Sequence, residues 1–302
     1  MSEEYVRRIR SLHCTDAQRE KVVSYLADRM GAFLHRRERV LICIPGRENN
    51  SLAGVFEDAV RKAGAIPMYW GPDFRWKALL RQAFSSRATA VIGQPLLLLG
   101  LMKLAKNAGT PLFIRNVLLT GYPWYHWMED GIRQGLDCHV WGCYIPGGDT
   151  MVAGFSCPEE KGIHIWKEAF DARLVSDKGI TLLPGERGRL ELTARDGSGK
   201  VWDTGDLATR ETLPCPCGEK GMLLRDIVPE KMPDTPFHQL MEPLLSWSSV
   251  LDFRAERTEM GLSLEVVCFP EELLPQLPTS AKLIFRYWNP DRDMPFCLQD
   301  SE

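Results

Sequence analysis

The stretch VLICIPGRENNSLAGVFEDAVRKAGAIPMY, residues 40–69, contains a strand, a helix and a second strand in succession. Residues 40–44 form a short apolar run with β-branched members, which is typical of a buried strand, and a Pro-Gly pair ends it. A helix is predicted from Ser51, because apolar residues then recur at helical spacing until Gly64. Residues 65–69 form the next strand. This order predicts a right-handed crossover between two parallel strands.

The same alternation continues on both sides of that unit. Thr15 and Gln18 have the spacing of a capping box, and apolar residues at helical spacing follow them within the predicted helix. Further helices are expected at 16–36, 75–84, 95–107 and 124–134, and further strands at 89–93, 116–120 and 138–142. The first half is therefore predicted to be α/β, with a mainly parallel sheet covered by helices on both faces.

After residue 142 the pattern changes to alternating polar and apolar residues separated by turns. Residues 188–193 alternate in this way, and Asp196-Gly197 follows as a hairpin turn. The nearby Gly-Ser-Gly-Lys sequence, residues 197–200, lacks the spacing of a phosphate-binding loop and is interpreted as a turn. A β-rich subdomain is expected over residues 143–228.

The last part of the chain predicts a small α+β appendage. Pro229, Pro233 and Pro236 indicate a hinge or linker. Strands are expected at 262–269 and 282–287, with a helix near 271–277. We predict two domains, residues 1–228 and residues 229–302.

Composition favours a soluble globular protein, with 44% hydrophobic and 25% charged residues among 302. The net charge of −3 comes from interspersed acidic and basic residues, so nucleic acid is not an expected partner. The leucine-rich run at 96–102 is too short to cross a bilayer, and no membrane association is expected. Nine cysteines without an export signal favour a cytoplasmic location, where thiols stay free or bind metal.

Four of the possible metal ligands occur in two short clusters. Cys157 and His164 form C-x6-H, and Cys215 and Cys217 form C-x-C between prolines and a glycine. Three thiolates and one imidazole are a ligand set that tetrahedral Zn²⁺ favours, and four protein ligands leave no open position for a substrate. Ordinary free cysteines are the alternative, because C-x-C is less diagnostic than a repeated C-x-x-C.

A series of motifs resembles the phenylacetate-CoA ligase branch of the adenylate-forming superfamily. The motifs are Gly121-Tyr-Pro-Trp124, Trp141-Gly142, Cys157, Gly162-Ile-His-Ile-Trp166, Gly185-Glu-Arg-Gly-Arg-Leu-Glu-Leu-Thr193, Asp203-Thr-Gly-Asp-Leu207 and Pro214-Cys-Pro-Cys-Gly218. The resemblance extends over about residues 20–230. It implies a truncated adenylate-forming fold and a structural zinc on Cys157, His164, Cys215 and Cys217.

The resemblance also implies cofactor-binding residues. Asp206 matches the aspartate that binds ribose hydroxyls, and the family places Trp141, Gly142 and Tyr122 at the nucleotide or CoA site. AMP, ATP or CoA is therefore an expected ligand, together with an aryl or acyl carboxylate. A carboxylate that accepts two hydroxyl hydrogen bonds is the physical reason for Asp206; a surface turn is the alternative.

Other family features are absent or altered. No Ser/Thr/Gly-rich phosphate loop precedes residue 40, so the chain is expected to lack the first part of a full ligase. The expected Tyr-Gly-x-Ser/Thr-Glu motif reads Trp-Gly-Cys-Tyr-Ile from residue 141, without its Glu, and Asp149 is the carboxylate that a shifted loop would offer. Lys231 stands where the hinge arginine is expected. The last lysine, Lys282, lies in a predicted strand and does not match the adenylation lysine.

Three hypotheses of function follow. The first is a zinc-stabilised relative that has lost ATP-dependent adenylation and acts as a binding or assembly protein, alone or as a homo-oligomer. The second is an active acyl-CoA ligase with a divergent ATP site. The third is one half of a split ligase, or an enzyme of another kind, and a split ligase predicts an exposed apolar face toward its partner. No catalytic residue is assigned.

Overall fold

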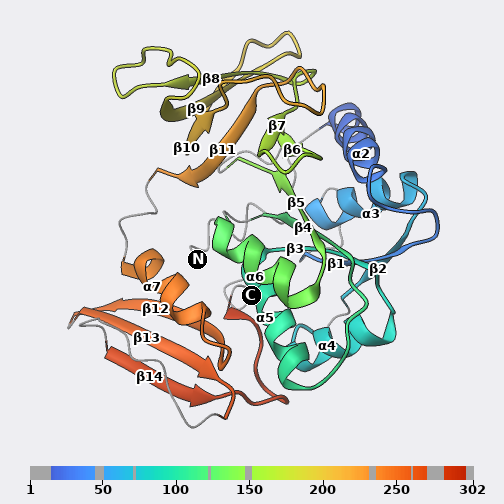
Figure 1. Cartoon of the computed structure of the whole chain (residues 1–302), viewed down its shortest axis with the longest axis vertical. Coiled ribbons are helices and arrows are strands. Elements are labelled where there is room, and N and C mark those ends of the chain that lie inside the picture. The colour runs from blue at the N-terminus through green and yellow to red at the C-terminus, as the bar shows by residue number, and fades with distance from the viewer. Residues whose placement is uncertain are drawn as a thin grey trace.

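A computed structural model describes residues 15–44, 51–70, 73–121, 124–146, 152–230, 236–259, 261–270 and 282–296. Within these residues the main element is an 11-stranded sheet with the order β2-β1-β3-β4-β5-β6-β7-β11-β10-β9-β8. A separate 3-stranded sheet has the order β12-β13-β14 (Figure 1). The predicted α/β class is confirmed.

The first five strands are parallel, as the alternating pattern predicts. They are β1 (Arg39–Cys43), β2 (Ile66–Tyr69), β3 (Ala90–Gly93), β4 (Asn116–Thr120) and β5 (His139–Tyr144). The helices between and before them are α2 (Asp16–Met30), α3 (Leu52–Lys62), α4 (Trp76–Ser85), α5 (Pro95–Asn107) and α6 (His126–Leu136).

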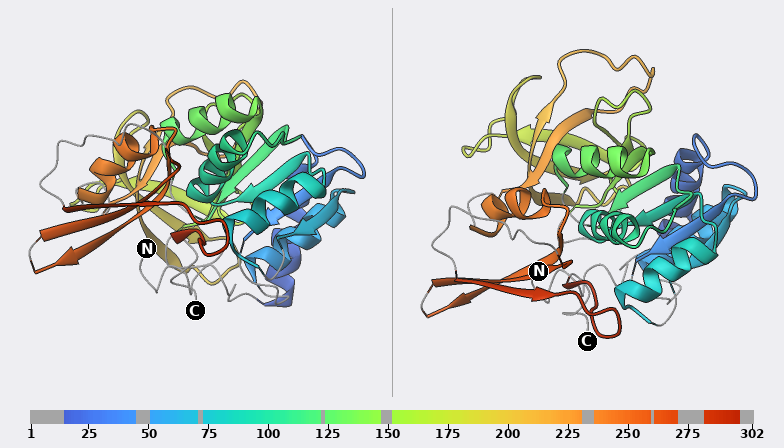
Figure 2. Two further views of the ribbon diagram at one scale, coloured as in Figure 1. Left: turned by 90° about the horizontal axis from the view of Figure 1, so that it is seen from below. Right: turned by 60° about the horizontal axis from the view of Figure 1, so that its bottom comes forward.

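Strand β1 shows why both faces of this sheet are covered. Val40 and Ile42 point into a buried cluster shared with α2 and α3, whereas Leu41 and Cys43 point into a second cluster shared with α4, α5 and α6. Side chains alternate between faces along a strand, so a strand that is apolar throughout needs a helical layer on each side. Figures 1 and 2 show the two layers of helices around the sheet.

The remaining strands of the large sheet form the β-rich part that the sequence predicts. They are β6 (Gly154–Ser156), β7 (Ile163–Ile165), β8 (Phe170–Val175), β9 (Arg187–Ala194), β10 (Val201–Arg210) and β11 (Leu223–Pro229), and they pair antiparallel. Strand β9 has a strict alternation of buried and partly exposed residues after Arg187. One face of this part is therefore buried and the other is in contact with solvent.

The C-terminal part consists of α7 (Pro236–Leu245), β12 (Val250–Thr258), β13 (Gly261–Cys268) and β14 (Lys282–Tyr287). Its buried residues belong to the same apolar cluster as those of α4, α5 and α6, including Leu244, Phe253, Val266 and Phe269. The small sheet is thus packed on the helical layer by a continuous core. The predicted boundary at residue 229 stays a prediction.

In the C-terminal part, helix α7 and strand β12 were not predicted, and near the start of the chain one helix was predicted too long. Helix α7 begins at Pro236, in a segment that the prolines indicated as a linker, although a proline suits the first turn of a helix. Strand β12 was also missed. Helix α2 ends at Met30 rather than at 36, because Gly31 caps it and a tight turn brings Phe33 back onto the sheet. The helix expected near 271–277 lies outside the described residues.

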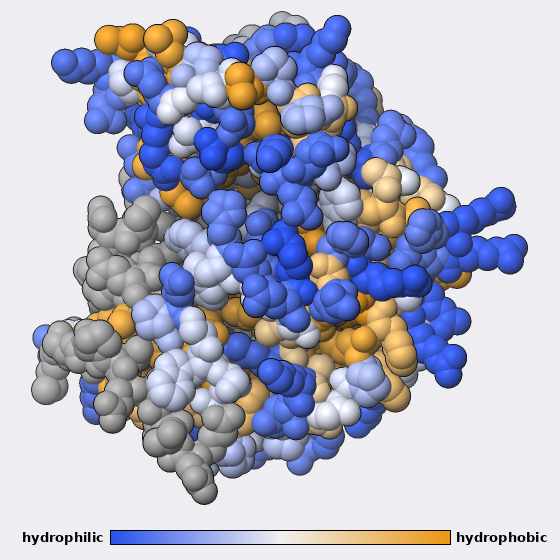
Figure 3. Space-filling view, viewed as in Figure 1, coloured by the Kyte–Doolittle hydropathy of each residue, from blue (hydrophilic) through white to orange (hydrophobic). Residues whose placement is uncertain are grey.

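The surface carries apolar side chains in small separate groups on the face seen in Figure 3, which is otherwise mainly hydrophilic. The exposed large apolar residues come from distant segments, such as Phe113 before β4, Leu183 before β9 and Ile284 on β14. No helix in the described part of the chain has the length and apolar character needed to cross a membrane.

Candidate functional site

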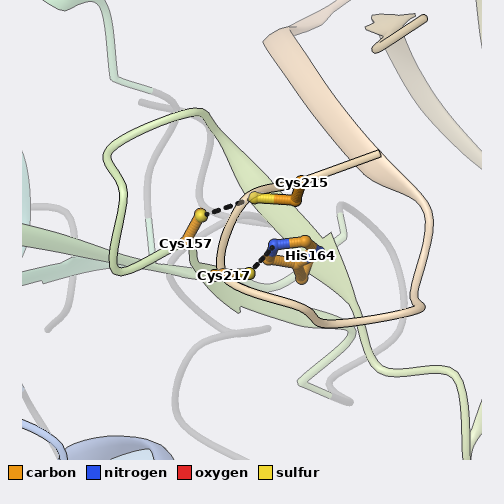
Figure 4. A group of neighbouring side chains, drawn as sticks. All are labelled: Cys157, His164, Cys215 and Cys217. Carbon is orange, nitrogen blue, oxygen red and sulfur yellow. Dashed lines mark hydrogen bonds between the residues drawn. The ribbon is translucent and has the colours of Figure 1, made fainter. Parts of the chain in front are cut away.

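The structure brings together the four residues that the sequence indicates as metal ligands. One ligand atom from each of Cys157, His164, Cys215 and Cys217 lies within 4.8 Å of all the others (Figure 4). Cys157 Sγ is 3.1 Å from Cys215 Sγ, and Cys217 Sγ is 3.2 Å from His164 Nε2. Tetrahedral zinc with thiolate bonds of about 2.3 Å separates its donors by about 3.8 Å, which lies inside this range.

Two connections supply these ligands. Cys157 follows β6 and His164 lies in β7, while Cys215 and Cys217 come from the loop between β10 and β11. Strand β11 pairs with β7 through Leu223 and His164, so the two connections meet at one place. Residues far apart in the sequence become neighbours through this strand pairing.

The Pro-Cys-Pro-Cys-Gly turn is shaped to present its thiols. Gly218 has φ +79°, a conformation that side chains rarely adopt, and its N–H donates to the carbonyl of Cys215. The N–H of Glu219 donates to Cys217 Sγ at 3.5 Å, and the N–H of Glu159 donates to Cys157 Sγ at 3.3 Å. Such donors stabilise thiolates, the form that binds metal.

The protonation chemistry of the cluster also fits a cation. Burial raises the pKa of the Cys157 thiol to about 12, so this sulfur carries a proton at neutral pH unless a cation replaces it. Burial lowers the pKa of His164, which keeps its imidazole neutral and able to coordinate. Three soft sulfurs and a neutral imidazole suit zinc better than they suit Mg²⁺ or Ca²⁺.

Helix α2 supports the ligand loop from outside. Arg29 forms a two-pronged ion pair with Glu219, with N–O distances of 2.5 and 2.6 Å. The guanidinium also lies over the ring of Tyr25, which stacks on Trp166 next to β7 at a centroid distance of 4.3 Å. These contacts connect the metal-ligand loop to the first helix of the fold.

A large cleft lies beside this cluster, with a volume of about 1580 Å³. Its walls come from α6, β5, the 156–163 loop, β10 and β11, and Cys157 and Cys215 are part of them. The cluster thus shapes one wall of the cleft. None of the described residues from 236 onward contributes to the lining.

Asp206 lies in the wall of this cleft and is only 7% exposed. The hydroxyl of Tyr144 donates a hydrogen bond to Asp206 Oδ2 at 2.5 Å. Burial raises the pKa of Asp206 to about 6, and the hydrogen bond from Tyr144 opposes that rise. Asp206 is therefore a buried carboxyl group that already has one hydroxyl partner.

Trp141 and Gly142 are consecutive residues of strand β5, and Trp141 lines the cleft whereas Gly142 does not. The Trp141 ring stacks on Phe33 with centroids 4.6 Å apart, and its indole N–H donates to Asn116 Oδ1 at 3.2 Å. A Cβ atom at Gly142 would lie 2.4 Å from the indole of Trp124, so only glycine lets that ring pack there. Tyr122 lies outside the described residues.

Features of the expected phosphate site are not found in this cleft within the described chain. Ile145 occupies the position at which the motif has its Glu, and it lines the wall. Lys282 lies on β14 in the small sheet and is not part of the lining. Asp149 and Lys231 lie outside the described residues.

Tyr144 is the residue of this site that sequence reasoning missed. The family motif has Ser or Thr at this position, and the sequence alone does not show which residue the longer side chain of tyrosine reaches. A polar residue inside the apolar run of β5 was the available signal, because buried hydroxyl groups find partners.

The comparisons with known proteins indicate the fold. No family model matches the chain, and no curated protein sequence matches it. The crystal structure of a 2-hydroxyisobutyryl-CoA ligase in the postadenylation state, with R3-HIB-AMP, is similar with a TM-score of 0.71 at 14% identity. The match covers 96% of this chain and 72% of the ligase.

Two further structures agree. The same ligase in the thioesterification state, with 2-HIB-AMP and CoA, matches with a TM-score of 0.63 over 87% of this chain and 63% of the ligase, at 15% identity. The amide bond synthetase McbA from Marinactinospora thermotolerans matches with a TM-score of 0.52 and 16% identity, over 87% of this chain and 61% of that one. The chain therefore has the fold of adenylate-forming ligases.

Proposed function

We propose that this chain is a zinc-stabilised relative of the phenylacetate-CoA ligases that holds a ligand in its cleft and does not form acyl adenylates. The observation that carries this proposal is the pair of Tyr144 and Asp206. One oxygen of the carboxylate expected to bind ribose already accepts a hydrogen bond from a side chain of the protein itself. In the resembling family, acyl-adenylate formation requires this carboxylate to bind the ribose of the nucleotide.

The charge of the cleft also argues against a bound triphosphate. Among the residues that the structure describes, eight Asp and Glu residues line it, against four Lys and Arg residues. The acidic residues are Glu38, Glu129, Asp130, Glu159, Glu160, Asp206, Glu211 and Asp226, and the basic ones are Arg115, Arg133, Lys161 and Arg225. A wall with this balance repels a polyanion, whereas phosphoryl transfer needs stabilised negative charge. Loss of a single such stabilising group costs about 3 kcal/mol in the transition state.

Zinc has a structural role in this proposal. Cys157, His164, Cys215 and Cys217 would hold it, and with four protein ligands it has no position left for substrate or water. The ion would join the loop between β10 and β11 to the β6–β7 connection and so keep one wall of the cleft in place. The free thiols of the chain imply a reducing compartment, so we propose a cytoplasmic location.

An aryl or acyl compound is the ligand class that the remaining wall favours. Phe33, Trp124, Tyr125 and Trp141 contribute aromatic surface to the cleft. Flat aromatic side chains bind apolar groups by contact area, and a few polar groups then orient the ligand. Nucleotides and CoA are the alternatives to be tested.

The presence of Asp206 favours one competing function, an active ligase with a divergent ATP site. Metal analysis and ATP–pyrophosphate exchange over aryl and short-chain acids distinguish the two. We expect about one zinc per chain and no exchange, together with a rise in melting temperature with an aryl or acyl ligand. Exchange at ordinary enzyme rates, abolished by Asp206→Asn, would establish the ligase instead.

A further inference from the structure

The contact between Tyr144 and Asp206 joins two strands, β5 and β10, that are not neighbours in the large sheet. Three strands separate β5 from β10 in the sheet order, so the two residues meet because the sheet curves around the cleft. Tyr144 is 5% exposed and Asp206 is 7% exposed, and both line the cleft. The pair is therefore buried within the wall and has a fixed geometry.

Neighbouring bonds hold the backbone of Asp206 in place. The backbone N–H of Asp206 donates to Thr204 Oγ1 at 3.2 Å, and the Thr204 hydroxyl donates to the carbonyl of Leu190 at 2.8 Å. Thr204 is itself buried. These bonds fix the backbone from which the Asp206 side chain extends, and the carboxylate itself is held by the hydroxyl of Tyr144.

A ribose ring would have to compete for that carboxylate. Its two adjacent hydroxyl groups would have to reach a carboxylate that is only 7% exposed and whose Oδ2 already accepts a hydrogen bond from the buried Tyr144 hydroxyl. A charge-assisted hydrogen bond of this length is among the stronger ones in proteins. The phenol ring also fills space that a Ser or Thr at this position leaves open.

The aromatic ring expected beside the nucleotide is engaged as well. Trp141 stacks on Phe33 with an interplanar angle of 12°, and its indole N–H donates to Asn116. This contact fastens the turn after α2 to strand β5. Trp141 still lines the cleft, so the exclusion of nucleosides depends on the contact between Tyr144 and Asp206.

We propose that Tyr144 is the specificity-determining residue of the cleft, and that its hydroxyl takes the place of a ribose hydroxyl on Asp206 and excludes nucleosides. This inference rests on the proposed ligand-binding function of the same cleft. It narrows the ligand to aryl or acyl compounds that present no ribose diol to Asp206.

The test is isothermal titration with adenosine and AMP on five proteins: wild type, Tyr144→Phe, Tyr144→Thr, Asp206→Asn, and Tyr144→Thr combined with Asp206→Asn. We expect no measurable binding to wild type. Tyr144→Thr removes both the hydroxyl contact and the ring, and should bind AMP at least tenfold more tightly than wild type. The double variant should lose that gain, because the gain depends on the Asp206 carboxylate.

Tyr144→Phe guards against a folding artefact, since it keeps the ring and removes only the oxygen. It should show a smaller gain than Tyr144→Thr. The inference would be overturned if wild type bound AMP and Asp206→Asn weakened that binding. It would also be overturned if neither Tyr144 variant bound AMP more tightly than wild type although both variants unfold cooperatively.

The outcomes also separate this inference from the proposed function. A gain in Tyr144→Thr with no response of wild type to any aryl or acyl compound supports the role of Tyr144 and contradicts the proposed ligand class. Pyrophosphate exchange by wild type contradicts both. A wild-type response to aryl acids without a gain in either variant contradicts only the role of Tyr144.

Discussion

Lys103 on α5 donates a hydrogen bond to the carbonyl oxygen of Val250 at the start of β12, with Nζ and O 2.8 Å apart. The same ammonium group reaches the carbonyls of Leu245 at 2.5 Å and Trp247 at 3.0 Å, at the end of α7 and in the turn that follows. Lys103 is 8% exposed. A helix layer of the large sheet and the C-terminal part are thus joined by one buried side chain.

The three acceptors determine the protonation state of this lysine. Burial lowers the pKa of Lys103 to about 7, but a neutral amine has only two N–H donors for three carbonyls. The ammonium form satisfies all three and places a cation at the C-terminal end of α7, where the helix dipole favours one. We therefore expect Lys103 to stay charged in the folded protein.

Lys103→Met should destabilise the protein by about 2–4 kcal/mol, because three buried carbonyls lose their donor. Urea denaturation measures the change, and hydrogen exchange should increase first at residues 246–253. Lys106→Met is the matched control on the same helix, since Lys106 is exposed, and it should change stability by less than about 0.5 kcal/mol. Equal effects of the two substitutions would contradict the role of Lys103.

Cys215→Ser should lower the zinc content from about one ion per chain to near zero and reduce the melting temperature, because one of four ligands is lost. Elemental analysis and calorimetry provide the measurements. Cys138→Ala, at a buried cysteine outside the cluster, should keep the metal. Wild-type protein purified without zinc, in buffers free of chelators, is the result that contradicts the metal site.

Arg29→Lys should destabilise the protein by about 1–2 kcal/mol, because an ammonium group cannot make the two parallel bonds of the guanidinium to Glu219. Since Glu219 follows the Cys215–Cys217 turn, zinc should also pass to a competing chelator faster. Arg173→Lys tests an exposed pair with Glu191 and should have little effect. An unchanged rate of zinc transfer in Arg29→Lys would argue against this coupling.

Asp206 should make folding stability dependent on pH. Its pKa rises from 3.8 to about 6 on folding, so its stabilising contribution is complete below pH 3.8 and is lost as pH rises through 6. Relative to wild type, Asp206→Asn should therefore become more stable by up to about 3 kcal/mol between pH 4 and pH 7. Both proteins carry the same metal ligands, so their difference isolates Asp206.

Denaturant titrations at several pH values measure this difference. Asp203→Asn changes an exposed carboxylate in the same strand and serves as the control. A difference between Asp206→Asn and wild type that is independent of pH would show that the carboxyl group ionises normally.

Gly142→Ala should shift the indole of Trp124, because the new methyl group would lie 2.4 Å from it. We expect a loss of about 1–3 kcal/mol and a change in tryptophan fluorescence. Gly131→Ala on α6 is the contrasting substitution. Its methyl group would make an ordinary contact at 3.4 Å with Leu99, and it should stabilise the helix by about 0.5–1 kcal/mol. Equal stability of the two variants would contradict the close packing of Trp124.

Local patterns predicted most of the regular structure. Helix α5 at 95–107 and strands β4 at 116–120 and β14 at 282–287 have the predicted bounds, because apolar periodicity and boundary residues such as Pro95 and Gly121 act over a few residues. Helix α7 and strand β12 escaped prediction. Pro229, Pro233 and Pro236 suggested a linker, and the apolar face of α7 is stabilised by a core contributed largely by other elements.

The sequence by itself determined the alternating α/β architecture and the residue types able to bind zinc, since these depend on local spacing and on the chemistry of side chains. Only the tertiary structure decided which side chains meet. Strand pairing between β7 and β11 brings the four ligands together, and the curvature of the sheet places the Tyr144 hydroxyl on Asp206. Contacts of this kind depend on the relative positions of strands distant in the chain, and no short pattern of residues contains that information.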